Sequence, residues 1–517
     1  MKFISGQDRN QTHLFPISLD QSIGSDNEVR LIDLFVDSLI LQDYGFKTEF
    51  IENGRPAYHP TDLLKLFIYG YLNKTRSSRD LEKACKINIE VMWLLKTLQP
   101  DHNTISNFRR DNPKAIKKVF RTTLKIAKHF NLIGGKLIAG DSTKFRAQNS
   151  KKNNFNSKKI ERHIAYIDQK IEEHTKDLAL ADKDRKVQQS QQIKKEIEKH
   201  RGRKATYKQI KKQIAQTGEK QVSTSDPDSR QMITRNNITE VAYNVQTTVD
   251  AKYHIPIDFK VTNTTDSKAM GDMLQRAKAI LGGNNFTALY DKGYHTGSEF
   301  KKAYDLEIDV MVAIPKVASQ APTPEYNVEH FVYNQEGDYY VCPQGSKLTT
   351  KGTWHKACNY KFKRYTTKDC ITCKAKALCT KAKYGKGVQR SEYQVFTNQN
   401  KERIEENKNY YRQRQSIVEH PYGTIKRQWG FSYIMTKKGM ERASADVGLI
   451  FTAYNFRRLI NILGKEVLIN YLRILVFSFF TRIGHVRAKI SRFNASELYS
   501  KIIKCFIQPP PNRLKFT

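Results

Sequence analysis

The sequence predicts an α/β protein in which a mixed sheet follows an all-helical N-terminal segment. Up to about residue 130, apolar residues recur at the spacing of helices that bury one face. From residue 136 to residue 314, short apolar runs of strand length alternate with helical stretches, as in a mixed α/β sheet. Two stretches, 150–220 and 342–390, differ in composition from their surroundings and are predicted to be insertions.

The charge of the chain is strongly positive. Lys and Arg number 89 against 52 Asp and Glu in 517 residues, which gives a formal net charge of +37. A surface this positive repels itself unless a polyanion neutralises it, so nucleic acid is the expected partner. A membrane is the competing polyanion. It would require a basic amphipathic helix or a basic cluster beside an apolar span, whereas here the charge is spread along the chain, so no membrane partner is expected.

Three features predict a cytoplasmic, nucleoid-associated location. The N-terminus turns polar at Gln7-Asp8-Arg9 before an apolar region develops, so no secretory signal is predicted. The longest apolar stretch, 467–480, is interrupted by Asn470 and Arg473 and is too short to span a bilayer, so it is predicted to be a buried helix. Seven cysteines, an odd number, fit a reducing compartment better than a disulfide framework.

The first 130 residues are predicted to contain three main helices. Pro60-Thr61-Asp62 begins the first, and Ser77-Ser78 caps a second that is expected to run through Leu94 to a stop at Pro100. Asn103-Thr104 is expected to cap a short third helix that carries two basic residues, Arg109 and Arg110. This pattern is typical of a helix-turn-helix in which Arg109 and Arg110 contact DNA. An ordinary three-helix bundle is the alternative.

The predicted sheet is built from short apolar runs. Strands are expected at 136–141, 241–249, 255–261, 286–290 and 309–314, with helices at 267–281 and 298–304. The stretch 150–220 holds twenty basic and ten acidic side chains and almost no Gly or Pro, which predicts a helical hairpin or short coiled coil inserted into the sheet domain. Its role is left open between a solvated helix pair, dimerisation and contact with a DNA backbone.

Two aspartates directly follow apolar runs of the predicted sheet. Asp141 follows 137–140, and Asp291 follows 288–290. Strand ends are where an α/β sheet presents chemistry, and carboxylates there suit hard divalent ions such as Mg²⁺. Two such ions, roughly 4 Å apart, stabilise the attacking and leaving oxygens of phosphodiester cleavage. Taken singly, however, an aspartate at the end of a strand is more often a turn or cap residue.

Glu419 lies in a long basic helix. Arg412, Glu419 and Lys426 are spaced by seven, so an unbroken helix would place them on one stripe, where the cations could hold phosphates beside a metal-binding carboxylate. Pro421 removes a backbone donor and is expected to disturb the helix near Lys426. The alternative role for Glu419 is half of a helical ion pair.

The cysteine-bearing insertion is a candidate zinc site. Cys342, Cys370, Cys373 and Cys379 are spaced C-x27-C-x2-C-x5-C, and thiolates paired two residues apart can enclose tetrahedral Zn²⁺. The last interval is longer than usual for such a site, so reduced, unligated cysteines are an equally good interpretation. With thirteen basic residues against one acid over 342–390, contact with a DNA backbone is expected in either case.

Together these segments resemble the DDE-class transposases of bacterial insertion sequences, which have a ribonuclease-H-like catalytic core. The resemblance covers most of residues 1–463. The matching pieces, in order, are Gly54-Arg55-Pro56, Tyr58-His59-Pro60, Leu63-Leu64-Lys65-Leu66, Tyr69-Gly70-Tyr71-Leu72, Arg76-Ser77-Ser78-Arg79-Asp80-Leu81-Glu82, Thr104-Ile105-Ser106-Asn107-Phe108-Arg109, Asp141-Ser142-Thr143-Lys144, Tyr243-Asn244-Val245-Gln246, Asp291-Lys292-Gly293-Tyr294 and Glu419-His420-Pro421-Tyr422-Gly423-Thr424-Ile425-Lys426.

The resemblance implies roles for these residues. Asp141, Asp291 and Glu419 would be the catalytic metal ligands for two Mg²⁺ or Mn²⁺ ions, with Lys426 as the basic residue after the glutamate. A wider group of these enzymes has Tyr, two residues, Arg, three residues and then the glutamate. Here four residues separate Arg414 from Glu419, so Tyr411 and Arg414 each lie one residue farther from the glutamate. The DNA contact therefore stays open between Arg412 and Arg414, and Lys292 is a further expected DNA contact.

The implied reaction is cleavage of DNA at the inverted repeats of a transposon, followed by attack of the freed 3′-hydroxyl on target DNA. A homodimer or larger assembly is expected when the two ends are paired. The alternative is a DNA-binding protein, a repressor or remnant, that keeps the fold without the chemistry. The expected domains are a helix-turn-helix-like domain at 1–130, a catalytic core at 131–149 and 221–340, a helical insertion at 150–220, a cysteine-containing insertion at 341–395, C-terminal core helices at 396–463 and a tail at 464–517.

Overall fold

The computed structural model describes residues 18–49, 56–184, 187–234, 238–315 and 321–490, and the side chains of the last helix up to Phe477. The polar N-terminus, the motif residues Gly54 and Arg55 and the tail beyond Ile490 lie outside the described residues. The chain divides into two compact units, one formed by residues 1–123 and 445–517 and the other by residues 124–444.

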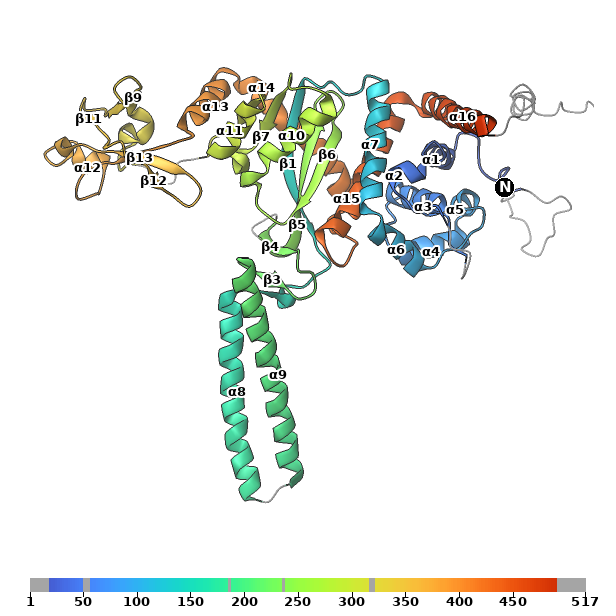
Figure 1. Ribbon diagram of the computed structural model, residues 1–517, viewed down its shortest axis with the longest axis horizontal. Coiled ribbons are helices and arrows are strands. Elements are labelled where there is room, and N and C mark those ends of the chain that lie inside the picture. Colours follow the sequence, from blue (N-terminus) through green and yellow to red (C-terminus); the bar gives the residue numbers. More distant parts are fainter. Residues whose placement is uncertain (1–17, 50–55, 185–186, 235–237, 316–320, 491–517) are drawn as a thin grey trace, which may run out of the picture. The chain divides into compact units, whose positions relative to one another are not determined.

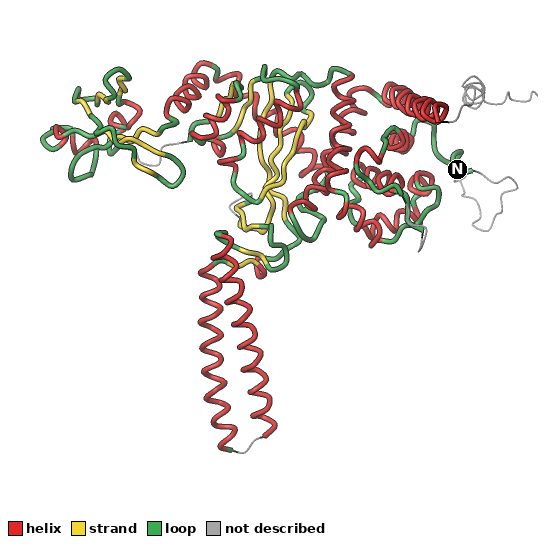
Figure 2. Tube along the Cα trace, viewed as in Figure 1, coloured by secondary structure: helices red, strands yellow, loops and turns green. Residues whose placement is uncertain are grey.

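The first unit is helical (Figure 2). Its helices are α1 (Glu28–Asp37), α2 (Leu41–Tyr44), α3 (Pro60–Leu72), α4 (Ser78–Ile87), α5 (Ile89–Leu94), α6 (His102–Asp111), the first part of α7 (Pro113–His129), most of α15 (Met440–Leu463) and α16 (Lys465–Ile490). Pro60 begins α3 and Ser77 caps α4, as predicted from the sequence.

Two helix boundaries in this unit differ from the prediction. The expected second helix is broken at Asn88, whose backbone is extended and whose side chain accepts a hydrogen bond from the Val91 N–H to cap α5. An Asn side chain competes for backbone donors in this way, which apolar periodicity does not register. Asp101, rather than Asn103-Thr104, caps α6 by accepting from the N–H groups of both those residues.

The expected burial of the C-terminal helix is also corrected. Among the described side chains of α16, Leu468 and Leu472 are buried, whereas Val467, Ile474 and Phe477 are exposed. The helix therefore buries one narrow stripe. Several of its apolar residues lie outside the face that packs against the unit.

A buried charge cluster connects α15 to the N-terminal helices within this unit. The Asp446 carboxylate accepts a short hydrogen bond from the Tyr71 hydroxyl and lies 3.4 Å from Arg76 Nη1 and 3.8 Å from Arg109 Nη1. Arg109 Nη1 also donates to the Tyr71 hydroxyl and to the Arg76 carbonyl, each at 3.0 Å. The side chains of Arg76 and Arg109 are 4% and 3% exposed and that of Asp446 is 0% exposed, so each charge depends on the others.

The second unit is built on a six-stranded mixed sheet (Figure 1). Its strands are β1 (Leu137–Arg146), β4 (Arg230–Ile233), β5 (Thr239–Asp250), β6 (Ile255–Thr262), β7 (Thr287–Tyr290) and β8 (Asp309–Val312). The strands lie in the order β6-β5-β1-β7-β8. β5 is antiparallel to both of its neighbours, β6 and β1, whereas β7 and β8 run parallel to β1. β4 pairs with the N-terminal end of β5.

Helices cover the sheet. α10 (Met270–Leu281) packs on β5 and β6 and against α11 (Gly297–Asp305). α14 (Lys408–Tyr422) places Ile417 and Val418 in one core cluster with Ala139 of β1 and Leu289 of β7. α13 (Gln394–Glu406) is fixed to β8 because the buried Asn400 side chain bonds both the N–H and the carbonyl of Val312, at 2.8 and 2.9 Å.

The stretch 150–220 forms a helical hairpin of α8 (Ser157–Lys183) and α9 (Val187–Thr217) (Figure 1). The short strands β2 (Asn154–Phe155) and β3 (Val222–Ser223) pair at its base. Phe155 and Val222 pack there with Ile160, Ile210 and Ile214. Salt bridges join the two helices at Lys204–Asp168 and Lys211–Glu161.

The cysteine-bearing segment forms two small antiparallel sheets. The first contains β9 (Val332–Asn334), β10 (Tyr339–Val341) and β11 (Lys347–Leu348), and the second contains β12 (His355–Lys356), β13 (Lys361–Tyr365) and β14 (Val388–Ser391). Phe331, Tyr340, Leu348, Tyr365 and Val388 form their shared core, and the short helix α12 (Lys376–Cys379) lies near the cysteines.

Asp446→Asn is expected to destabilise the protein by about 3 to 5 kcal/mol, because it leaves two buried guanidinium groups without their anion. Urea unfolding followed by circular dichroism measures the loss. Asp20→Asn is the control, since Asp20 pairs with Arg30 from a side chain that is 70% exposed and should contribute less than about 1 kcal/mol. Equal losses in the two variants would contradict a structural role for the buried cluster.

Candidate active site

Asp141 and Asp291 are placed together by the parallel pairing of β1 with β7. Ala139 lies opposite Leu289 in that pairing, and each aspartate follows its paired residue by two positions. β7 ends at Tyr290, so Asp291 begins the connection that follows, whereas β1 continues to Arg146. The two carboxylates therefore lie together at the carboxyl-terminal end of the β1–β7 pairing. We call this end of the pairing the edge of the sheet.

A glycine permits the close approach of these strands. A Cβ atom on Gly140 would lie 1.9 Å from Cε1 of Tyr290, so the tyrosine ring rests directly on the glycine backbone. Gly140 precedes Asp141 and Tyr290 precedes Asp291. The contact thus holds the two residues that carry the aspartates against each other.

The charge environment of Asp141 differs from that of an ordinary surface carboxylate. Burial raises the pKa of Asp141 to about 6, with further contributions from the nearby Asp291 and Asp266 carboxylates. Arg414 and a 2.7 Å hydrogen bond from the Ser142 N–H act in the opposite direction. Asp291 accepts a 2.8 Å hydrogen bond from the Gly293 N–H and caps the short helix Lys292–Tyr294. Three carboxylates thus share this edge, and the sequence analysis did not single out Asp266.

Helix α14 lies across the edge that carries the two aspartates. Its Tyr411 hydroxyl donates to the carbonyl of Tyr290 at 2.9 Å, and its Tyr422 hydroxyl lies 3.5 Å from the carbonyl of Asp141. Arg414 Nη1 lies 3.7 Å from Asp141 Oδ2. Glu419 is exposed on the same helix and accepts from Gln415 Nε2 at 2.9 Å.

The structure distinguishes the two arginines that the sequence left open. Arg414 faces Asp141, whereas Arg412 is exposed and reaches Asn409 Oδ1 at 3.4 Å. Arg414, not Arg412, is therefore the arginine of α14 that meets Asp141.

The disturbance expected at Pro421 takes the form of a wider helical turn. Pro421 lies inside α14, and a π-helical segment, Gly423–Gln428, follows directly. Such a segment rotates less per residue than an α-helix, so the seven-residue spacing no longer keeps Lys426 on the stripe of Arg412. Lys426 Nζ donates to the carbonyl of Lys144 at 2.7 Å.

A groove of about 820 Å³ adjoins this edge. It is lined by Glu419 and Tyr422 together with four cationic residues, Lys144, Arg146, Lys426 and Arg427. Glu240 also lines it and pairs with Arg146 at 3.3 Å. Of these four cations, only Lys426 was predicted from the sequence to contact DNA. The alternation of Ser142, Lys144 and Arg146 along β1 is the signal that could have identified two more, since every second residue of a strand shares a face.

The donor set suits a hard divalent cation. The described residues contain no group of three or more His, Cys, Asp or Glu side chains that could hold a metal ion as they are placed. The chemistry of the edge nevertheless fits such an ion, because its groups are carboxylate oxygens and burial, with a smaller contribution from Asp291 and Asp266, raises the pKa of Asp141, so that a cation would stabilise its charged form.

The expected DNA contact of Arg109 is wrong. Its side chain is only 3% exposed within the Asp446 cluster, where Nη1 donates to the Tyr71 hydroxyl, so the guanidinium is not available to a phosphate. Arg110 lies on the surface and pairs with its neighbour Asp111 at 2.6 Å. Lys292 is exposed directly after Asp291.

The four cysteines of the candidate zinc site line one cavity of about 20 Å³. Tyr326, Phe331 and Ala375 are among its other walls. Burial raises the pKa of Cys379, which favours the neutral thiol. Cys358, by contrast, is exposed.

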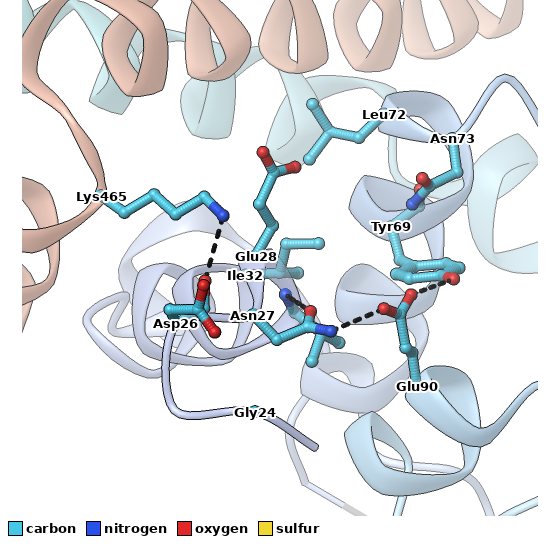
Figure 3. Close-up of a pocket in the computed structure, with 11 residues that line it drawn as sticks. Gly24, Asp26, Asn27, Glu28, Ile32, Tyr69, Leu72, Asn73, Glu90 and Lys465 are labelled. Carbon is cyan, nitrogen blue, oxygen red and sulfur yellow. Dashed lines mark hydrogen bonds between the residues drawn. The ribbon is translucent and has the colours of Figure 1, made fainter. Parts of the chain in front are cut away.

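In a pocket of about 320 Å³ in the helical unit, polar groups of the lining residues form hydrogen bonds with one another (Figure 3). Glu90 accepts hydrogen bonds from Asn27 Nδ2 at 2.7 Å and from the Tyr69 hydroxyl at 2.6 Å. Lys465 Nζ donates to the carbonyl of Asp26 at 3.1 Å. These bonds connect α1, α3, α5 and α16, so the pocket is explained by packing of the unit.

Comparison with known proteins identifies the class. The family model described as a transposase domain (DUF772) matches residues 17–111, and the model described as a transposase DDE domain matches residues 341–460. The second match includes Glu419, whereas Asp141 and Asp291 lie outside both matches. Residues 17–111 thus match a transposase domain, and residues 341–460 match a transposase DDE domain.

No curated protein matches the chain. A solved structure of a piggyBac transposase synaptic complex with hairpin DNA is similar at 10% sequence identity and a TM-score of 0.28, over 94% of this chain and 87% of that chain. In the described residues, no helix has both the length and the apolar character needed to cross a membrane.

Gly140→Ala is expected to destabilise the protein by about 1 to 3 kcal/mol, because the new methyl group would overlap the Tyr290 ring. Thermal unfolding measures the effect. Gly202→Ala is the matched control: nothing lies within 4 Å of a Cβ atom there, and replacing a helical glycine should stabilise by about 0.5 to 1 kcal/mol. A neutral Gly140→Ala variant would show that β1 and β7 can separate freely.

Proposed function

We propose that this transposase is an active, metal-dependent enzyme that cuts DNA at the inverted-repeat ends of a transposon and joins the freed 3′-hydroxyl to target DNA. Its catalytic carboxylates are Asp141, Asp291 and Glu419, on a ribonuclease-H-like core. The observation that carries the proposal is the position of α14. The helix bearing Glu419 lies where Asp141 and Asp291 follow the paired residues of β1 and β7, and it contacts the backbone of Tyr290 and the side chain of Asp141.

The sheet order supports the proposed core. Three antiparallel strands, β6, β5 and β1, are followed by β7 and β8 parallel to β1. This is the mixed sheet expected from the resemblance to ribonuclease-H-like enzymes. We assign residues 131–149, 221–340 and 396–463 to this core, 150–220 and 341–395 to its two insertions, and 1–130 to DNA binding.

Asp141, Asp291 and Glu419 would hold two Mg²⁺ or Mn²⁺ ions, which supply Lewis-acid stabilisation of the attacking and leaving oxygens when bound. The other contributions come from the chain itself. Arg414 balances the charge of Asp141, and the cations of the groove hold the phosphates of a DNA strand beside Glu419. Lys292 is positioned by the short helix after Asp291 for a similar contact.

Asp141→Asn, Asp291→Asn and Glu419→Gln are each expected to reduce cleavage of labelled transposon-end DNA by at least about 100-fold, because each removes a charge that stabilises the transition state. Binding of the same DNA should persist, since the basic groove is unchanged. Glu405→Gln is the control, a 55% exposed glutamate on the neighbouring helix α13 that pairs with Lys401.

Full cleavage by the three variants would overturn the site. A wild-type protein that binds end DNA but never cleaves it with Mg²⁺ or Mn²⁺ would instead support the alternative, a silent DNA-binding remnant of the family.

We also propose that the cysteine insertion binds structural Zn²⁺ through Cys342, Cys370, Cys373 and Cys379, on the basis of their convergence on one cavity. Metal analysis of purified protein is expected to find about one zinc ion per chain. A Cys370→Ser/Cys373→Ser variant should lose it, and the exposed Cys358→Ser variant should retain it. Wild-type protein without zinc would leave these residues as reduced thiols.

A further inference from the structure

Asp266 lies close to the proposed catalytic aspartates but belongs to no predicted motif. It begins a 3-10 turn, Asp266–Lys268, that follows β6 and leads into α10. Its side chain is only 18% exposed. A Cβ atom on Gly293 would lie 3.0 Å from Asp291 Oδ1 and 3.6 Å from Asp266 Oδ2, so both carboxylates lie close to the same glycine.

The oxygens of Asp266 are bound by side chains from two strands of the sheet. Oδ1 accepts from Asn244 Nδ2 and from Gln246 Nε2, each at 2.7 Å. Oδ2 accepts from Lys144 Nζ at 3.4 Å. Asn244 and Lys144 are opposite each other in the pairing of β5 with β1. The carboxylate therefore fixes β5 and β1 from one face of the sheet.

The same network reaches the segment that follows Asp291. Gln246 accepts a hydrogen bond from the Tyr294 hydroxyl through Oε1 while its Nε2 holds Asp266. Tyr294 is buried and ends the short helix that Asp291 caps. Lys144 also donates to Ser142 Oγ at 3.1 Å, next to Asp141. Asp266 is thus connected on one side to the Asp141 strand and on the other to the Asp291 helix.

Asp266 remains charged in this setting. Burial acts to raise the pKa of Asp266, but the Lys144 cation and the hydrogen bonds from Asn244, Ser142 and Gln246 hold it below its usual value. A permanent anion whose oxygens already have donors is suited to holding neighbours in place. Its oxygens have less capacity left for a metal ion than those of Asp141 or Asp291.

We propose that Asp266 is a positioning residue for the transposase reaction: by holding Lys144, Asn244 and Gln246, it sets the distance between Asp141 on β1 and Asp291 after β7. This inference rests on the proposed function of the two aspartates. Active sites depend on such supporting contacts because small displacements of reacting groups slow catalysis strongly.

The test measures DNA cleavage by Asp266→Asn, which keeps the shape of the side chain but places an amide or a neutral oxygen against Lys144. The turnover number is expected to fall about 10- to 100-fold, with the KM for DNA, the Mg²⁺ concentration for half-maximal rate and the melting temperature nearly unchanged. Asp272→Asn, which removes an exposed carboxylate paired with Lys260 at 2.9 Å, is the control and should cleave at the wild-type rate.

A double-mutant cycle with Lys144→Met tests whether Asp266 acts through its ion pair. Turnover numbers are compared at saturating DNA, because Lys144 also lines the groove, and the two losses are expected to be non-additive, so that the double variant is hardly slower than either single variant. Lys144→Met also removes the same pair from its other side, which keeps the test available if Asp266→Asn does not fold.

Three results would overturn the inference. An unchanged turnover number would show that Asp266 positions nothing, and a raised Mg²⁺ requirement that is independent of Lys144 would make it a ligand. A loss of rate matched by a loss of folded protein would make its role purely structural. Failure of the proposed function is distinguishable, because in the same assay either the wild-type protein would then not cleave or Asp141→Asn would cleave normally.

Discussion

The parallel pairing of β1 with β7 is the constraint on which the candidate site depends. It brings two aspartates that are 150 positions apart in the chain to the same edge, because each follows a paired residue by two positions. The pairing is close enough that the Tyr290 ring occupies the space where a side chain at position 140 would lie. Backbone hydrogen bonds and this packing contact therefore bring the two aspartates to one end of the strand pair, and α14 adds its arginine and glutamate there.

Negative charge is gathered at this edge of a chain whose net charge is +37. The pKa of Asp141 is raised to about 6 mainly by burial, and the carboxylates of Asp291 and Asp266 add to this. Cations border the cluster: Arg414 lies against Asp141, and Lys144 lies against Asp266. This separation of an acidic edge from a basic groove is what a phosphodiester and divalent cations would together require.

Much of the architecture could be predicted from local patterns. The strands around Asp141 and Asp291, the helical hairpin and the cap at Ser77 are visible in the sequence because they depend on apolar periodicity and on side chains a few residues away. The predictions that failed have two causes, a contact between residues far apart in the chain and a local side-chain hydrogen bond. Arg109 lies in a short basic helix, a pattern that predicts contact with DNA. Its guanidinium is nevertheless buried against Asp446, which follows it by more than 300 positions in the chain. The break at Asn88 depends on a side-chain hydrogen bond that periodicity does not record.

The sequence by itself determined the kinds of elements, the basic character of the chain and the three acids that are candidates for catalysis. Those properties follow from composition and from the spacing of neighbouring residues. Only the tertiary structure decided that Arg414 rather than Arg412 meets Asp141, and that Asp266 joins the two aspartates through side chains of β1 and β5. The physical reason is that a side chain's partner is chosen by the packing of elements distant in the chain. The turn of α14 toward the sheet and the register of β5 on β1 are not encoded in any local interval.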